Sequence, residues 1–78
     1  MVTVVNNTSS TLHVSVPYQS KQDNGGFYTL EPNGGQESWD RSNVTIAFVI
    51  KSPVVAKSQP KVFVIPAGGT IIINSNDL

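Results

Sequence analysis

The chain contains no cysteine, and it has only one histidine, His13, among its 78 residues. The absence of thiols excludes disulfides and thiolate metal sites, two devices that stabilise many small domains. One histidine and five scattered acidic residues do not form a metal site either. A chain this short buries only about 60% of its unfolded surface. Because the chain has no set of metal ligands, we expect no cofactor. Because its core is small, we predict that it is stabilised as a homo-oligomer, either a symmetric dimer or a dimer of dimers.

Charged residues are also scarce, and neither sign is in excess: they make up 13% of the chain and sum to a net charge of zero. Residues 1–40 hold one basic and four acidic residues, a net −3, whereas residues 41–78 hold four basic and one acidic, a net +3. Nucleic-acid binding needs a larger positive excess, so we expect none. The split either arose by chance or favours contact between unlike halves, within one chain or between subunits.

Long apolar runs and basic amphipathic segments are missing as well. The longest apolar run ends at Ile50 and is far too short to span a bilayer. No segment is basic and amphipathic enough to dock on a membrane. Residues 1–5 show neither the basic nor the apolar part of a secretion signal. We expect a cytoplasmic protein, or the mature form of a secreted protein that has lost its signal peptide.

Strand patterns dominate what is present. Between Thr11 and Val16, apolar and polar residues alternate strictly, as in a half-buried strand. Similar patterns, including a Pro-x-Gly-Gly turn, return after 34 residues. This period predicts a unit of three strands that occurs twice and is followed by one more strand. The corresponding segments are 2–5 with 36–39 and 70–73, 11–16 with 45–50, and 30–35 with 64–69.

The strand spacing predicts one all-β domain over residues 1–78. We expect a small antiparallel β-sandwich or a partly closed barrel of six to seven strands, with an internal pseudo-twofold repeat of 34 residues. The alternation and the repeat together assign the inward-facing residues. The predicted core is Val2, Val4, Leu12, Val14, Val16, Phe27, Leu30, Trp39, Ile46, Phe48, Ile50, Val62, Val64, Ile71 and Ile73.

Polar side chains next to aromatic ones give the best candidates for a ligand site. A sugar ring can stack on an aromatic face while its hydroxyls pair with nearby polar groups. Trp39, the only tryptophan, precedes several such groups, although the repeat aligns it with apolar positions and so also allows a core role. Tyr18 lies in the long polar loop after Pro17, and loops often carry binding residues. The predicted ligand-binding residues are Tyr18, Tyr28, Trp39, Asp40, Arg41 and Asn43.

Three apolar residues are candidates for a subunit interface. Val54 and Val55 lie in a loop bounded by Pro53 and Pro60, where apolar side chains either cover the core or form a contact patch. Ile72 belongs to a strand that is apolar on both faces, which is typical of a central strand or of an interface. We therefore predict that Val54, Val55 and Ile72 contact another subunit.

No motif predicts catalysis. His13 has no suitably placed serine or cysteine, and the Gly-Gly pairs do not precede a helix as phosphate-binding loops do. We therefore expect a non-enzymatic binding module, lectin-like in binding glycans through exposed loops of a homo-oligomer, because several copies strengthen weak sugar binding. The alternative is a structural or assembly protein that acts by self-association or by contact with a protein partner.

Overall fold

The structure, a computed structural model, describes residues 1–17, 26–53 and 57–78. These residues form seven strands and a short 3-10 helix, which confirms the all-β prediction. Short runs of alternating β-branched residues form the strands, and Asn, Pro and Gly occupy the tight connections. The elements are β1 Val2–Asn7, β2 Leu12–Ser15, β3 Tyr28–Leu30, β4 Gly35–Trp39, β5 Thr45–Lys51, β6 Lys61–Ile65, β7 Thr70–Asn74 and η1 Ser75–Asp77.

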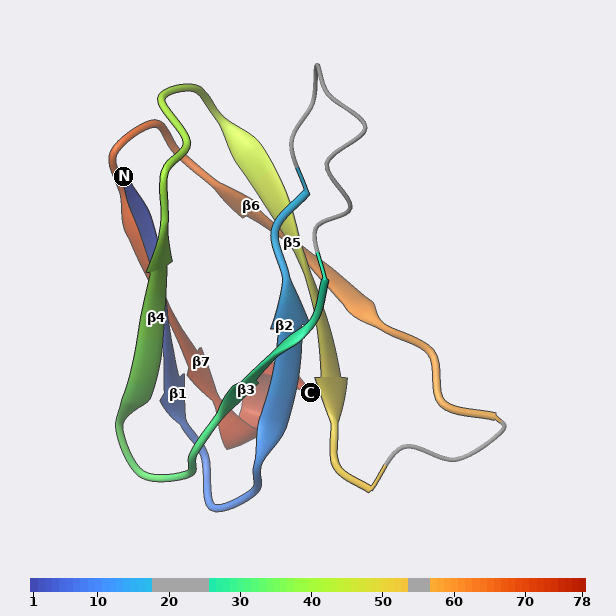
Figure 1. Cartoon of the computed structure of the whole chain (residues 1–78). Coiled ribbons are helices and arrows are strands. Elements are labelled where there is room, and N and C mark those ends of the chain that lie inside the picture. The colour runs from blue at the N-terminus through green and yellow to red at the C-terminus, as the bar shows by residue number, and fades with distance from the viewer. Residues whose placement is uncertain (18–25, 54–56) are drawn as a thin grey trace.

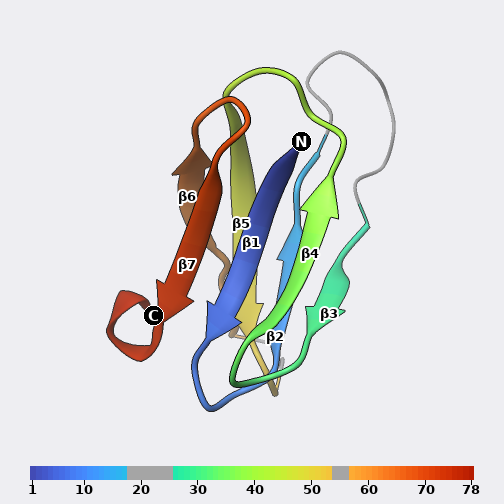
Figure 2. The ribbon, with the colours of Figure 1, turned by 90° about the vertical axis from the view of Figure 1, so that its left-hand side faces the viewer.

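The strands form two sheets that face each other as a β-sandwich (Figure 1). The three-stranded sheet has the order β4-β1-β7, and the four-stranded sheet has the order β3-β2-β5-β6. Figure 2 views the sandwich from the side of the three-stranded sheet, with β1 between β7 and β4. Every strand pair is antiparallel except β1 with β7, which run parallel. The fold is thus a sandwich with one parallel pair.

A buried amide joins the two sheets at one end of the sandwich. Asn6, at the end of β1, is fully buried. Its Nδ2 lies 2.8, 3.1 and 3.0 Å from the carbonyl oxygens of Ser10, Leu30 and Glu31. Its Oδ1 accepts hydrogen bonds from the backbone N–H and the hydroxyl of Thr8, at 3.0 and 2.7 Å. This one side chain therefore fixes the β1–β2 loop against the end of β3.

In the first Gly-Gly turn, the two glycines are needed for different reasons. In the first turn, Asn33 and Gly34 have φ angles of 63° and 113°, in the region that favours asparagine and glycine. Gly35 has no such φ angle, but a Cβ there would collide with the backbone of Glu31. The N–H of Gly34 also donates to the Asn6 carbonyl at 2.7 Å, which joins this turn to the amide network.

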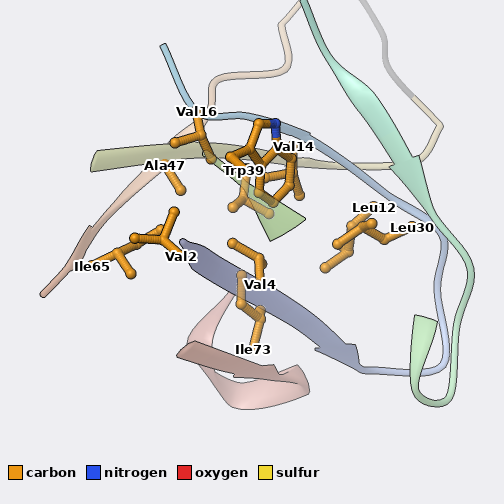
Figure 3. Packing of buried hydrophobic residues seen from close by; sticks show 11 residues of the cluster. Val2, Val4, Leu12, Val14, Val16, Leu30, Trp39, Ala47, Ile65 and Ile73 are labelled. Carbon is orange, nitrogen blue, oxygen red and sulfur yellow. The ribbon is translucent and has the colours of Figure 1, made fainter. Parts of the chain in front are cut away.

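The core confirms the sequence prediction for β1 and β2. Val2, Val4, Leu12, Val14 and Val16 are fully buried, as are Leu30, Trp39 and Ile73 to within a few per cent. Figure 3 shows Trp39 reaching across the sandwich toward Val14 and Val16. The remaining buried apolar residues, Ala47, Val49 and Ile65, were not among those predicted.

For β5 and β6 the predicted face was wrong. Thr45, Ala47 and Val49 point inward, so that the other side of β5 lies outside the sandwich. In β6 the inward residues are Phe63 and Ile65. The predicted core residues that lie outside or only partly inside are Phe27, Ile46, Phe48, Ile50, Val62, Val64 and Ile71, the last packed against the core.

The 34-residue spacing explains both the success and the error. The chain visits the sheets in the order three-stranded, four-stranded, four-stranded, twice over, and then returns to the three-stranded sheet. Strand order therefore follows the predicted unit. The direction of the side chains does not follow the predicted unit, because the 34-residue spacing aligns Leu12, which is buried, with Ile46, which is exposed. A shift of one residue turns every side chain of a strand to the opposite face. The pseudo-twofold symmetry itself stays a prediction.

Candidate functional site

The predicted ligand-binding residues lie in different environments. Trp39 is buried, and its ring contacts that of Tyr28 edge-on, with centroids 5.7 Å apart and planes at 87°. The indole face is therefore part of the core and is closed to a stacking sugar. Tyr28 is about half exposed, at 49%, because its strand β3 is the edge of the four-stranded sheet. Of this aromatic pair, Tyr28 is the ring that a ligand can reach.

Arg41 connects the loop after β4 to the end of β2. Its Nη1 donates to the Asp40 carbonyl at 3.1 Å, and its Nη2 donates to the carbonyl of Val16. These bonds hold the guanidinium against the backbone, so that it orders the loop. The side chains of Asp40 and Asn43 are exposed on the same loop. The structure thus places Tyr28 at the start of β3 and places Asp40 and Arg41 just after β4. The guanidinium of Arg41 is held by backbone carbonyl groups there.

The predicted interface residues are only partly covered by the structure. Val54 and Val55 lie outside the described residues, as does Tyr18, which was predicted to bind a ligand. Ile72 lies on the outer side of β7 and is 56% exposed. It therefore projects from an edge strand of the three-stranded sheet, where another molecule could reach it.

One exposed apolar surface among the described residues was not predicted from the sequence. It is the outward side of β5 and β6, which we call the apolar face and define as Ile46, Phe48, Ile50, Val62 and Val64. Val62 and Val64 are 56% and 64% exposed, and Ile46 is 37% exposed. Contiguous apolar surface of this kind is a sign of an interaction site in a soluble protein. The available signal was that both sides of β5 are apolar in sequence.

Strand register brings the five residues of the apolar face into one continuous surface. Ile46 pairs with Val64, and Phe48 pairs with Val62 on the neighbouring strand. On β2, the other strand that pairs with β5, His13 lies opposite Ile50 and Ser15 lies opposite Phe48. Directly paired side chains on one face of a sheet are about 5 Å apart, so the rows are in contact. No member of the apolar face is charged.

The borders of the apolar face differ in character. On one side lies β2, where the His13 Nδ1 is 3.3 Å from the Thr29 hydroxyl. On the other side β6 is the edge of its sheet, with no further strand paired to it in the described part of the chain. Where β5 ends and β6 begins, Lys51, Lys57 and Lys61 are exposed. The face is therefore open along β6 and basic at one end.

One hollow lies beside these lysines. Val49, Lys51, Gln59, Lys61 and Leu78 line it, and its volume is about 190 Å³. Pockets that enclose drug-sized ligands measure about 300–1,000 Å³. This hollow is smaller and lies at the open side of the sandwich, so it offers a ligand little enclosure.

The described residues offer no cluster of three or more histidine, cysteine or acidic side chains that could hold a metal ion. No helix among them is long and apolar enough to cross a membrane. Comparisons with protein-family models, with curated proteins and with solved structures gave no match.

Proposed function

We propose that this chain is a non-enzymatic assembly protein that acts by self-association through the apolar face. One observation carries the proposal: five apolar side chains, of which Ile46, Val62 and Val64 are exposed and Phe48 and Ile50 are half-buried, lie in adjacent rows on the outward side of β5 and β6. Burial of exposed apolar area is the main driving force of protein association. The same contact would add buried surface to a domain of only 78 residues, whose core is small.

Light scattering over a concentration series tests this proposal. We expect the mass of the wild-type protein to rise above the 8.4 kDa of one chain as concentration increases. The double variant Val62→Lys/Val64→Lys should remain at the mass of one chain, because charged groups resist burial. Both valines are more than half exposed, so the variant should still fold.

A matched control places the same charges elsewhere. Gln36 and Ser38 are exposed on β4, at the edge of the other sheet. The variant Gln36→Lys/Ser38→Lys should associate as the wild type does. A wild-type protein that stays monomeric up to about 1 mM, a concentration equivalent to only about −4 kcal/mol of binding, would contradict the proposal. Equal association of the two lysine variants would contradict it as well.

Glycan binding is a second candidate, and the exposed ring of Tyr28 favours it. The buried ring of Trp39 packs edge-on against this ring, and the exposed Asp40 follows Trp39 directly in the sequence. A glycan array is the appropriate screen. For any glycan that binds, Tyr28→Ala should weaken binding about tenfold, whereas Tyr28→Phe retains the ring and should bind nearly normally. Binding that is unchanged in Tyr28→Ala would exclude this surface.

A further inference from the structure

We propose that the hollow at the open side of the sandwich binds a small carboxylate that carries a short apolar group. The residues that line this hollow are Val49, Lys51, Gln59, Lys61 and Leu78. Lys51 and Lys61 hold the carboxylate, and Val49 and Leu78 contact the apolar group. The site lies on the inward side of β5 and β6, whereas the apolar face lies on their outward side, so the site is independent of the proposed self-association.

Strand register places both lysines on the core side of their sheet. Lys61 lies directly opposite Val49, and Lys51 lies directly opposite Leu12. Both of these partners are buried in the core. Residues that face each other in an antiparallel pair share one side of the sheet, so both lysines project from the inward side. Charged side chains seldom have such positions, but β6 is an edge strand, and the two lysines remain exposed.

The two lysines are close enough to share one anion. Lys61 pairs with Val49, and Lys51 is two residues further along the same strand as Val49. The two lysines are therefore diagonal neighbours, which lie about 7–8 Å apart in an antiparallel pair. Two ammonium groups at this spacing repel each other, and an anion between them relieves the repulsion. Each ammonium group offers three donors, and the amide of Gln59 offers two more.

The acidic residues of the described chain leave positive charge in excess at the hollow. None of the five lining residues is acidic. Asp77 precedes Leu78, but its Oδ2 accepts a hydrogen bond from the backbone N–H of Asn74 at 2.7 Å. The other acidic residues lie on β4 or beside its ends, at the side of the sandwich away from β6 (Figure 2): they are Glu31, Glu37 and Asp40. An anion from solvent is therefore attracted to this end of β5 and β6.

The size and the floor of the hollow restrict the ligand. Its volume of about 190 Å³ equals the space of roughly six water molecules at about 30 Å³ each. A ligand of about six to eight non-hydrogen atoms fits this space. Val49 is buried and Leu78 packs against the core, so together they offer an apolar surface to a short branched chain. We expect isovalerate, a branched carboxylate of this size, to bind with a Kd on the order of 1 mM.

An NMR titration of the backbone amide signals with isovalerate at low ionic strength tests the site. The signals of the residues that line the hollow should shift most. Lys51→Met and Lys61→Met keep most of the apolar stem but remove the charge, so each should weaken binding about tenfold. Lys57→Met is the matched control, because it removes the same charge outside the hollow. It should weaken binding less than about twofold.

Two further probes test the two halves of the ligand. Isovaleramide has the shape of isovalerate without its charge and should not bind measurably. Inorganic phosphate has the charge without an apolar group and should bind more weakly than isovalerate. Phosphate binding as tight as that of isovalerate would overturn the proposed ligand class, because the apolar floor would then contribute nothing.

The variants decide whether the hollow itself is the site. Weaker binding in Lys51→Met and Lys61→Met, with binding retained in Lys57→Met, supports the proposal. Equal weakening in all three would mean general attraction to positive charge and would overturn it. Absence of shifts up to about 50 mM isovalerate, far above the expected Kd, would overturn it as well. Lys61 would then serve only to protect the open edge of β6 from pairing, and Lys61→Met should raise the mass in solution. Light scattering on the wild type tests the proposed function separately, so either proposal can fail without the other.

Discussion

At the scale of single residues, Asn6 occupies a buried position that requires both the donor and the acceptor of its amide. It is a fully buried amide whose partners include three carbonyl oxygens from two other segments. From sequence, the stretch from Asn6 to Ser10 reads only as a polar loop between two strands. Nothing in local composition distinguishes Asn6 from the exposed Asn7 next to it, because the difference comes from the return of β3 to the same place.

Replacement of Asn6 by leucine tests this network. Asn6→Leu keeps the volume of the side chain but leaves buried carbonyl groups without a donor, which we expect to lower the free energy of unfolding by about 2–4 kcal/mol. Asn7→Ala removes an exposed hydrogen bond to Asn74 and should cost about 0.5 kcal/mol or less. Urea denaturation gives both values. Equal losses in the two variants would show that the buried amide is not the critical one.

At the scale of elements, sequence reading located the strands but misassigned a face. The expected strand segments 2–5, 11–16, 36–39, 45–50 and 70–73 agree with β1, β2, β4, β5 and β7 to within two residues at each end. Strand β2 alternates between apolar and polar residues, so its inner face could be read directly. Strand β5 is apolar on both faces, so alternation alone does not show that Ala47 and Val49 are the buried side.

The inner face of β5 can be tested by enlarging one residue. Ala47 is fully buried, so Ala47→Leu should overpack the core and lower the free energy of unfolding by about 1–3 kcal/mol. Ile46→Leu, one position along on the exposed side, should change it by less than about 0.5 kcal/mol. Thermal or urea unfolding at low protein concentration separates these effects from association. The opposite order would restore the face that the repeat predicts.

The candidate site shows the same limit of sequence reading. The exposed aromatic Tyr28 and the polar loop at Asp40 could be anticipated, because their residue types suit the surface. The role of Arg41 could not be anticipated from the sequence, because its contact with the Val16 carbonyl joins positions 25 apart in sequence. The apolar face was equally hidden, since it depends on which side of β5 and β6 is turned inward.

At the scale of the whole molecule, self-association and stability should be coupled. A dimer that forms only from folded chains raises the thermal midpoint as protein concentration increases. For a domain of this size we expect a rise of about 3–6 °C for each tenfold increase in concentration. The Val62→Lys/Val64→Lys variant should show no such rise, and differential scanning calorimetry measures both. A concentration-independent wild-type midpoint would mean that folding and assembly are separate.

The parallel pairing of β1 with β7 has a consequence for how the protein is made. β1 is the middle strand of its sheet, and Thr3 lies beside Thr70. During synthesis, β1 emerges well before one of its two neighbours, because Thr70 follows Thr3 by 67 residues. Contacts between such distant segments slow folding and leave an apolar strand edge exposed in the meantime. A nascent chain therefore cannot complete this sheet until β7 has been translated.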